Sequence, residues 1–300
     1  KIFNYMKNQF ILFLAAFAIG QLSAQTDSTG LPGDFFSLQG ALEIFKQSES
    51  PEEFEKLLNR ETSKVSNLDL DNDGEVDYIK VIEKMNGDAH VFVLQIAVSE
   101  KENQDIAAIE LEKVSNTEAN IQIVGDDFIF GEEKIVEPSD GTEEEMEDSK
   151  GGPSPEGYFH PAVVINVWPW PCVRFVYAPA YKVWVSPWRW RAYPGWYRPW
   201  RPLTFAVWHP FRARYYGPAF RVVHTHRLAT AHRIYTPVRV HSKTVHTRYE
   251  GAHKTYHVTK HKTTVTGPRG NKVTKTNTTV RGPHGHVKAE KTTVTRSRRR

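Results

Sequence analysis

The segment YIKVIEKMNGDAHVFVLQIAV, residues 78–98, decides the fold that the sequence predicts. Apolar and polar residues alternate over 78–85, and apolar residues dominate 90–98. The Asn86-Gly87 pair between these runs is typical of a tight β-hairpin. Two further strand-like runs, 106–113 and 119–124, follow at the spacing of a meander. We therefore expect an antiparallel sheet.

Two helices are predicted upstream of this hairpin, within residues 33–61. Ser50-Pro51-Glu52-Glu53 forms a capping box with proline at the first helical position. An earlier serine, Ser37, precedes apolar residues at helical spacing. Those apolar residues are Leu38, Ala41, Leu42 and Phe45. The helices and the meander together predict an α+β domain over residues 33–137, long enough to bury one hydrophobic core.

Between the predicted helices and the sheet lies an aspartate-rich loop, DLDNDGEVD, residues 69–77. Carboxylates occupy loop positions one, three, five and nine, and Gly74 occupies position six. Calcium prefers six to eight oxygen ligands, and a glycine permits the sharp turn that points alternate residues inward. Glu75 offers its carbonyl oxygen at position seven. The candidate metal ligands are Asp69, Asp71, Asp73, Glu75 and Asp77.

This loop resembles an EF-hand calcium loop, but Lys80 occupies the position of the bidentate acid of that family. Because a strand is predicted directly after Asp77, the segment is more similar to the loop-then-strand calcium sites of FG-GAP-type repeats. The resemblance implies calcium as the cofactor. Because the twelfth ligand is missing, we expect a dissociation constant of about 10⁻⁴ to 10⁻³ M. The alternative is a solvated acidic turn, since Asp, Asn and Gly are favoured turn residues. Repulsion among four aspartates favours the calcium interpretation.

Residues 1–24 have the pattern of a signal peptide. Lys7 supplies the positive charge, residues 10–19 form an uninterrupted apolar run, and Leu22-Ser23-Ala24 is a plausible cleavage site. The alternative is a membrane anchor, but the run is shorter than the ~20 residues that a spanning helix needs. We therefore expect export, with a location in the periplasm, at the outer membrane or outside the cell.

Charge divides the chain into two halves. Residues 1–150 contain 32 acidic and 12 basic residues, a balance of −20, whereas residues 151–300 contain 3 and 27, a balance of +24. Residues 138–157 are acidic and rich in Gly and Pro, which predicts a disordered linker. The asymmetry indicates that the basic half binds a polyanion, a membrane surface or the acidic half itself. The single cysteine, Cys172, excludes an intramolecular disulfide framework.

Residues 158–220 are rich in tryptophan, arginine and proline, and all eight tryptophans lie between 168 and 208. The frequent prolines disfavour helices, so we expect short extended strands and polyproline stretches. Interleaved indole and guanidinium groups offer stacking faces and bidentate donors to phosphate or carboxylate. The candidate polyanion-binding residues are Trp188, Arg189, Trp190, Arg191, Trp196, Arg198, Trp200 and Arg201.

This region resembles tryptophan- and proline-rich segments of bacterial envelope proteins. Tryptophan partitions to the bilayer interface, where anionic head groups attract arginine, so we expect an anionic envelope polymer or a membrane surface as the partner. Nucleic acid is an alternative partner, through arginine contacts and tryptophan stacking. In a third interpretation there is no partner, and the tryptophans pack on one another in a small β-structure.

Residues 221–300 form a basic tail rich in His, Thr and Val, whose low complexity predicts partial disorder. Thr-Thr-Val recurs at 263–265, 278–280 and 292–294 with Gly-Pro-x-Gly between the copies, which predicts short hairpins. His224-x-His226 and the histidines at 253, 257 and 261 have spacings found in metal sites. We expect them instead to add positive charge below about pH 6.5.

The sequence contains no phosphate-binding glycine loop, no G-x-S-x-G elbow and no H-E-x-x-H motif. It therefore predicts a secreted, non-enzymatic binding or structural protein of the cell envelope, with a calcium-stabilised acidic module and a basic aromatic tail. A hydrolase using two acids of the acidic half is the alternative from another class, although no spacing singles out such a pair.

Overall fold

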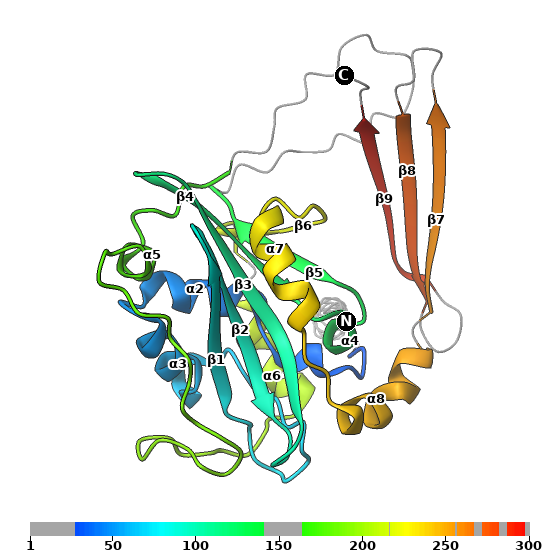
Figure 1. The fold of residues 1–300 in the computed structure, drawn as a ribbon. Coiled ribbons are helices and arrows are strands. Elements are labelled where there is room, and N and C mark those ends of the chain that lie inside the picture. The colour runs from blue at the N-terminus through cyan, green and yellow to red at the C-terminus, as the bar shows by residue number, and fades with distance from the viewer. Residues whose placement is uncertain are drawn as a thin grey trace, which may run out of the picture.

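The computed structural model describes residues 28–140, 164–215 and 217–255, together with the backbone of three strands beyond residue 256. The predicted signal peptide, 1–24, and most of the predicted linker, 138–157, lie outside the described residues. The fold is α+β, as the sequence predicts. Helices pack on an antiparallel sheet with the strand order β1-β2-β3-β4-β5-β6 (Figure 1).

The two predicted N-terminal helices are confirmed as α2 (Leu38–Gln47) and α3 (Pro51–Leu58). Each begins where a serine hydroxyl accepts a backbone N–H three residues further on, at 3.0 Å for Ser37 and 3.2 Å for Ser50. These caps satisfy donors that the first helical turn leaves free. Two short 3-10 helices, η2 (Pro32–Phe35) and η3 (Glu61–Ser63), flank the pair.

Six strands form the main sheet. They are β1 (Ile79–Asn86), β2 (Ala89–Ala97), β3 (Asn103–Ser115), β4 (Glu118–Gly125), β5 (Lys134–Pro138) and β6 (Phe220–Val223). The first four confirm the predicted meander. In the hairpin Asn86 pairs with Ala89, so the turn residues are Gly87 and Asp88, one position later than predicted. Gly87 has a φ of +60°, the conformation of the first central residue of a type II′ turn.

Both faces of the sheet are covered (Figure 1). Phe92 and Leu94 of β2 belong to the hydrophobic cluster that contains α2 and α3. Val91 and Val93 belong instead to a cluster with α7 (Ala229–Tyr235), which lies on the opposite face. Successive strand residues point to opposite faces of the sheet. Since helices cover both faces, β2 is buried along almost its whole length.

Residues 164–255 belong to the same fold as the acidic half. β6 extends the sheet by pairing with β5, and α5 (Pro171–Val176) packs on α2. Pro171 occupies the first position of α5, where its missing N–H costs no hydrogen bond, so proline does not prevent this helix. The remaining helices of this half are α6 (Phe205–Ala213), α7, η4 (Thr236–Val238) and α8 (Lys243–Thr255).

The short helix α4 (Asp127–Phe130) connects β4 and β5 within the acidic half. Near the C-terminus, three strands form a separate antiparallel sheet of order β7-β8-β9. They are β7 (His257–Thr266), β8 (Lys272–Arg281) and β9 (Val287–Ser297). The three Thr-Thr-Val repeats fall in these three strands, as the predicted hairpins require.

Candidate functional site

The aspartate loop, residues 69–77, curls tightly between the N-terminal helices and β1. Asn72 and Gly74 adopt φ values of +61° and +85°, and Gly74 has open space around it. This left-handed backbone is easy for glycine and tolerated by asparagine. The curl brings one carboxylate oxygen of each of three residues within 4.8 Å of the others. These residues are Asp69, Asp71 and Asp73.

Backbone N–H groups hold the three carboxylates inside the loop. Asp69 Oδ2 accepts the N–H of Gly74 at 3.1 Å, and Asp71 Oδ1 accepts that of Asp73 at 3.1 Å. The buried Oδ1 of Asp69 has no hydrogen-bond partner among the described residues. Burial raises the pKa of Asp69, and the charges of Asp71 and Asp73 act in the same direction. The cluster thus offers oxygen ligands to a cation.

The carboxylates of Asp77 and Glu75 are not part of this cluster, and the predicted ligation through the carbonyl oxygen of Glu75 stays a prediction. Asp77 is buried, and its Oδ2 accepts the N–H of Leu70 at 2.5 Å, which closes the base of the loop. Burial, with the charges of the neighbouring aspartates, raises the pKa of Asp77 well above its usual value. Glu75 is exposed, and its N–H donates to Asp73 Oδ1 at 3.0 Å.

The Trp/Arg segment, residues 188–201, lies directly against the aspartate loop. The N–H of Val76 donates to the carbonyl oxygen of Trp200 at 2.8 Å, and the hydroxyl of Tyr197 donates to the carbonyl of Val76 at 2.5 Å. The indole Nε1 of Trp190 donates to Asp71 Oδ2 at 3.3 Å. Residues of both segments line a pocket of about 340 Å³. The structure therefore joins the two sites that the sequence placed more than a hundred residues apart.

A cation from α8 also contacts the aspartate loop. The guanidinium of Arg248 donates to the carbonyl oxygen of Leu70, and it lies 3.4 Å from the carbonyl oxygen of Asp71. These two contacts use backbone oxygens and occupy none of the carboxylate oxygens of the cluster.

The Trp/Arg segment exposes its charged groups and half-buries most of its indoles. The exposed arginines are Arg189, Arg191, Arg198 and Arg201, and the half-buried tryptophans are Trp188, Trp190 and Trp200. Trp196 is 40% exposed. The Arg191 guanidinium lies 4.4 Å from the centre of the Trp190 ring, while that of Arg198 donates to backbone carbonyls at 2.8 Å. Within the described part of the chain these four arginines make no ion pair with an acid.

The sheet face under α7 buries acidic side chains that accept hydrogen bonds from the basic half. Glu137 of β5 is 3% exposed and accepts from Arg221 at 2.8 Å and from Arg227 at 3.0 Å. Gln122 of β4 donates to the same carboxylate at 2.9 Å. On β3, Asp105 Oδ2 accepts the N–H of Val240 at 2.9 Å. Acidic groups of the first half thus position the segment around α7.

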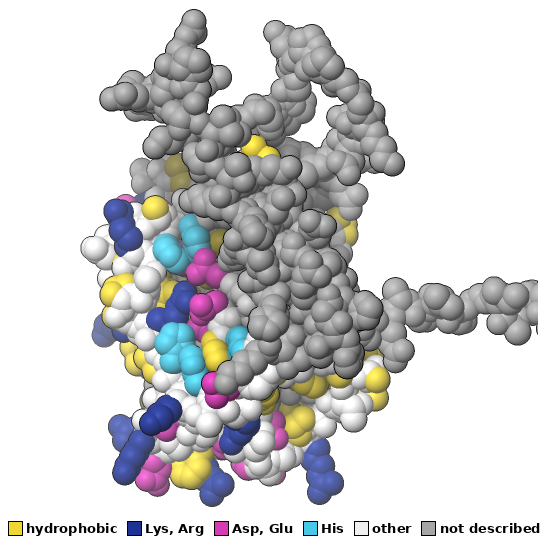
Figure 2. Space-filling model, turned by 90° about the vertical axis from the view of Figure 1, so that its right-hand side faces the viewer, with side chains coloured by type: hydrophobic (Ala, Val, Ile, Leu, Met, Phe, Trp, Pro, Cys, Tyr) yellow, Lys and Arg dark blue, Asp and Glu magenta, His cyan; other side chains and the backbone are white. Residues whose placement is uncertain are grey.

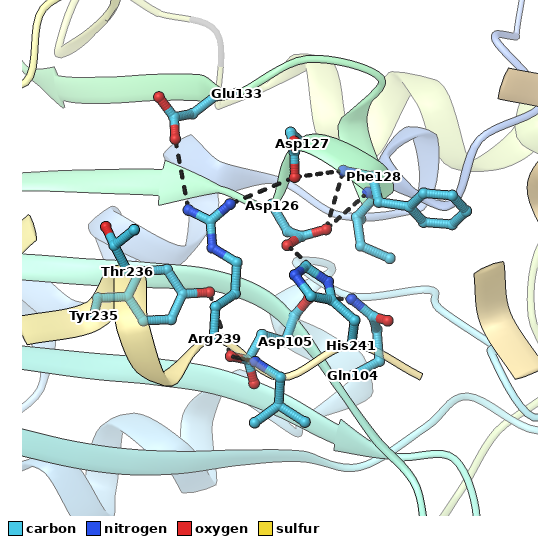
Figure 3. A network of polar contacts seen from close by, with 12 residues as sticks. Gln104, Asp105, Asp126, Asp127, Phe128, Glu133, Tyr235, Thr236, Arg239 and His241 are labelled. Carbon is cyan, nitrogen blue, oxygen red and sulfur yellow. Dashed lines mark hydrogen bonds and ion pairs between the residues drawn. The ribbon is translucent and has the colours of Figure 1, made fainter. Parts of the chain in front are cut away.

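Arg239 lies at the centre of the polar network in Figure 3. Its guanidinium is 3.4 Å from Asp127 and 3.5 Å from Glu133. Nearby, His241 Nδ1 lies 3.6 Å from the buried Asp126. Burial, with the charge of Asp127, raises the pKa of Asp126 to about 7. This network connects α4 with the chain that follows α7.

Histidine and acidic side chains gather on the same side of the molecule (Figure 2). A pocket of about 720 Å³ is lined by Asp127, Glu132 and Glu133 and by His241, His246 and His253. A second group with metal-ligating side chains consists of Glu110, His226 and His232, whose ligand atoms lie within 4.8 Å of one another. We call it the His/Glu cluster. Burial, followed by nearby acids, raises the pKa of Glu110 to about 8.

Comparisons with known proteins assign no function to the site. No protein-family model, no curated protein and no solved structure matches this chain. In the described part of the chain, no helix has the length and apolar character needed to cross a bilayer. The structure shows an α+β protein with an aspartate cluster that could hold a metal ion.

Proposed function

We propose that the protein is an exported, non-enzymatic binding or structural protein of the cell envelope. A calcium ion at Asp69, Asp71 and Asp73 stabilises the aspartate loop, and the Trp/Arg segment that packs on this loop contacts an anionic polymer or lipid surface. The observation that carries this proposal is the direct packing of the Trp/Arg segment on the loop, through Val76, Trp190 and Tyr197.

The aspartate loop supports calcium rather than a softer metal. Its three clustered groups are all carboxylates, the hard oxygen ligands that calcium prefers. Three like charges within 4.8 Å repel one another unless a cation lies among them. Since the loop lacks a bidentate twelfth ligand, the expected affinity stays at about 10⁻⁴ to 10⁻³ M.

The Trp/Arg segment supports a polyanion as partner. Four exposed guanidinium groups without acidic partners in the described residues provide charge, and the partly exposed indoles provide flat stacking faces. Calcium bound beside Trp190 holds this surface in place. Envelope polymer or anionic lipid fits the exported location that we propose, and nucleic acid remains the alternative partner.

Thermal unfolding tests the calcium site. At about 10 mM calcium, an ion bound with the expected affinity stabilises the folded state by about 1.4 to 2.7 kcal/mol. Asp73→Asn keeps an oxygen that accepts the N–H of Glu75 but removes the charge, so this variant should lose the calcium effect. Asp88→Asn, in the exposed turn between β1 and β2, is the control and should keep it. Identical melting curves in calcium and in chelator would refute the site.

Binding assays at two salt concentrations test the polyanion surface, with the whole protein against lipopolysaccharide, peptidoglycan, anionic vesicles and single-stranded DNA. Arg191→Ala and Arg198→Ala should each weaken binding and reduce the slope of log affinity against log salt by about one. Arg174→Ala, exposed on α5 outside the segment, is the matched control. A preference for DNA would favour the alternative. Absence of binding at low salt, or equal losses in all three variants, would refute the surface.

A further inference from the structure

We propose a second metal site, for a borderline divalent transition metal such as zinc, formed by Glu110, His226 and His232. The three residues come from both halves of the chain: Glu110 lies in β3, His226 precedes α7 and His232 lies within α7. One ligand atom of each lies within 4.8 Å of the other two. This site is independent of the calcium proposal, because it shares no residue with the aspartate loop.

The hydrogen bonds of His226 leave its Nδ1 as the free donor atom. Its Nε2 lies 2.6 Å from Glu133 Oε1, and a carboxylate accepts, so Nε2 carries the proton. Nδ1 is buried and has no hydrogen-bond partner among the described residues. In zinc sites, a ligating histidine commonly donates its other ring N–H to a carboxylate, which fixes the orientation of the ring.

The hydrogen bonds of His232 likewise leave its Nδ1 as the nitrogen with a free lone pair. Thr236 Oγ1 donates its single proton to the carbonyl oxygen of His232 at 2.8 Å, so at 3.2 Å it accepts from Nε2–H of the ring. The lone pair of Nδ1 then points to Glu110 Oε1, 3.0 Å away. Two acceptors this close need a shared proton or a cation between them.

The spacing of these atoms suits a metal ion. Two donor atoms on a tetrahedral zinc ion, with bonds of about 2.0 to 2.1 Å, lie about 3.3 Å apart. The observed 3.0 Å between His232 Nδ1 and Glu110 Oε1 is close to this separation. The rings of His226 and His232 are also adjacent, with centres 3.8 Å apart. Because the three ligand atoms lie within 4.8 Å of one another, a metal ion would draw in any pair that is more than about 3.3 Å apart.

Burial supplies the independent observation that points to a ligand. The side chain of Glu110 is fully buried, and its Oε2 has no hydrogen-bond partner among the described residues. A buried carboxylate oxygen without a partner is costly. His226 Nδ1, in the same cluster, is a second buried atom without a partner. A metal ion bound through Glu110 Oε1 and His226 Nδ1 would give Nδ1 a partner and would compensate the charge of the buried carboxylate.

The donor set separates this site from the aspartate loop in metal preference. Two imidazoles and one carboxylate are the protein ligands of several zinc centres, which leave a fourth position open, whereas calcium takes oxygen ligands alone. Glu133 accepts from His226 Nε2 at 2.6 Å and also lies 3.5 Å from Arg239, so it acts as a positioning residue for His226 and not as a ligand. A metal here would tie α7 to the main sheet.

Zinc titration of the whole protein against a chromophoric chelator, with calcium in excess to fill the aspartate loop, tests the site. The wild type should bind one zinc ion in competition with the chelator. His232→Ala and Glu110→Gln should each lower the affinity at least about 100-fold, and Glu133→Gln about 10- to 100-fold. His224→Ala is the matched control, because His224 is exposed and lies outside the cluster, and it should change the affinity less than twofold.

Two measurements keep the test decisive if a variant folds poorly. Far-UV circular dichroism without metal shows whether each variant is folded. Cobalt bound to the wild type should give the visible absorption of a four- or five-coordinate site with nitrogen and oxygen ligands. Zinc should also raise the melting temperature of the wild type. The proposal is overturned if the wild type binds no zinc in excess calcium, or if His232→Ala binds zinc as tightly as His224→Ala.

Discussion

Replacing Glu137 by alanine removes the acceptor that holds two segments of the basic half on the main sheet. The carboxylate accepts from Arg221 at 2.8 Å, from Arg227 at 3.0 Å and from Gln122 at 2.9 Å. Arg221 lies in β6, the edge strand that the basic half contributes. The substitution leaves two guanidinium groups and one amide without this acceptor.

The expected loss of stability follows from the burial of these partners. Breaking a buried ion pair by removing one member costs about 3 to 5 kcal/mol, because a charge is left without compensation. Glu137 is buried, but the side chains of Arg221 and Arg227 are 23% and 32% exposed, so water reaches both cations. We therefore expect a value at the lower end, about 3 kcal/mol.

Equilibrium unfolding in urea measures this loss. With a slope of about 3 kcal/mol per M, the midpoint should fall by roughly 1 M without a change of slope. Glu61→Ala is the control, because it removes an exposed pair with Lys64 at 3.2 Å that contributes at most about 1 kcal/mol. If Glu137→Ala costs no more than Glu61→Ala, the ion pairs around Glu137 do not hold the two halves together.

Three further outcomes follow from buried groups. Burial raises the pKa of Asp126 to about 7, so protonation of Asp126 favours the folded state, and the free energy of unfolding should fall as the pH rises from about 4 through 7. Asp126→Asn still caps α4 but does not titrate, so it should reduce the loss of stability between pH 5 and 8 by at most about 3 kcal/mol. Urea titrations of both proteins at the two pH values measure this difference. Burial raises the pKa of the Cys172 thiol, so a thiol reagent should label it only after unfolding, and rapid labelling of the native protein would contradict its position in the core. Leu228→Ala should cost about 2 to 5 kcal/mol by leaving a cavity between α7 and the sheet, and a loss below about 1 kcal/mol would mean that α7 does not pack there.

The parts of the fold that sequence predicted are those with local signals. Ser37 and Ser50 mark the starts of α2 and α3 because a cap acts within one helical turn. Gly87 fixes the β1–β2 turn for the same reason. The aspartate loop was also found, since its three clustered carboxylates lie within five residues of sequence. Spacing did not show that Asp77 closes the loop through Leu70 instead of joining the cluster.

The parts that were missed depend on partners far away in sequence. β5 and β6 pair across an interval that includes the predicted linker, so neither short strand stands out alone. The His/Glu cluster joins residues up to 122 positions apart. One overlooked signal was local: Leu228, Ala231 and Tyr235 repeat at helical spacing within a segment that composition marked as low complexity. Composition masked the amphipathic pattern of α7.

The opposite charges of the two halves have a structural role as well as the external one that we propose. Several acids of the first half are buried, and some of their hydrogen-bond donors come from the second half. Glu55 accepts from Ser186 at 2.8 Å, Glu83 from the N–H of Trp184 at 2.8 Å, and Glu137 from two arginines. An acidic half on its own would lose these donors, which costs several kcal/mol for each charge that stays buried. An isolated basic half would expose cations that acidic side chains neutralise in the whole protein, and it would therefore bind polyanions without selectivity. In the folded protein the arginines of the Trp/Arg segment stay exposed, whereas Arg221 and Arg227 bind Glu137, so the binding experiments that test the proposed partner require the whole chain.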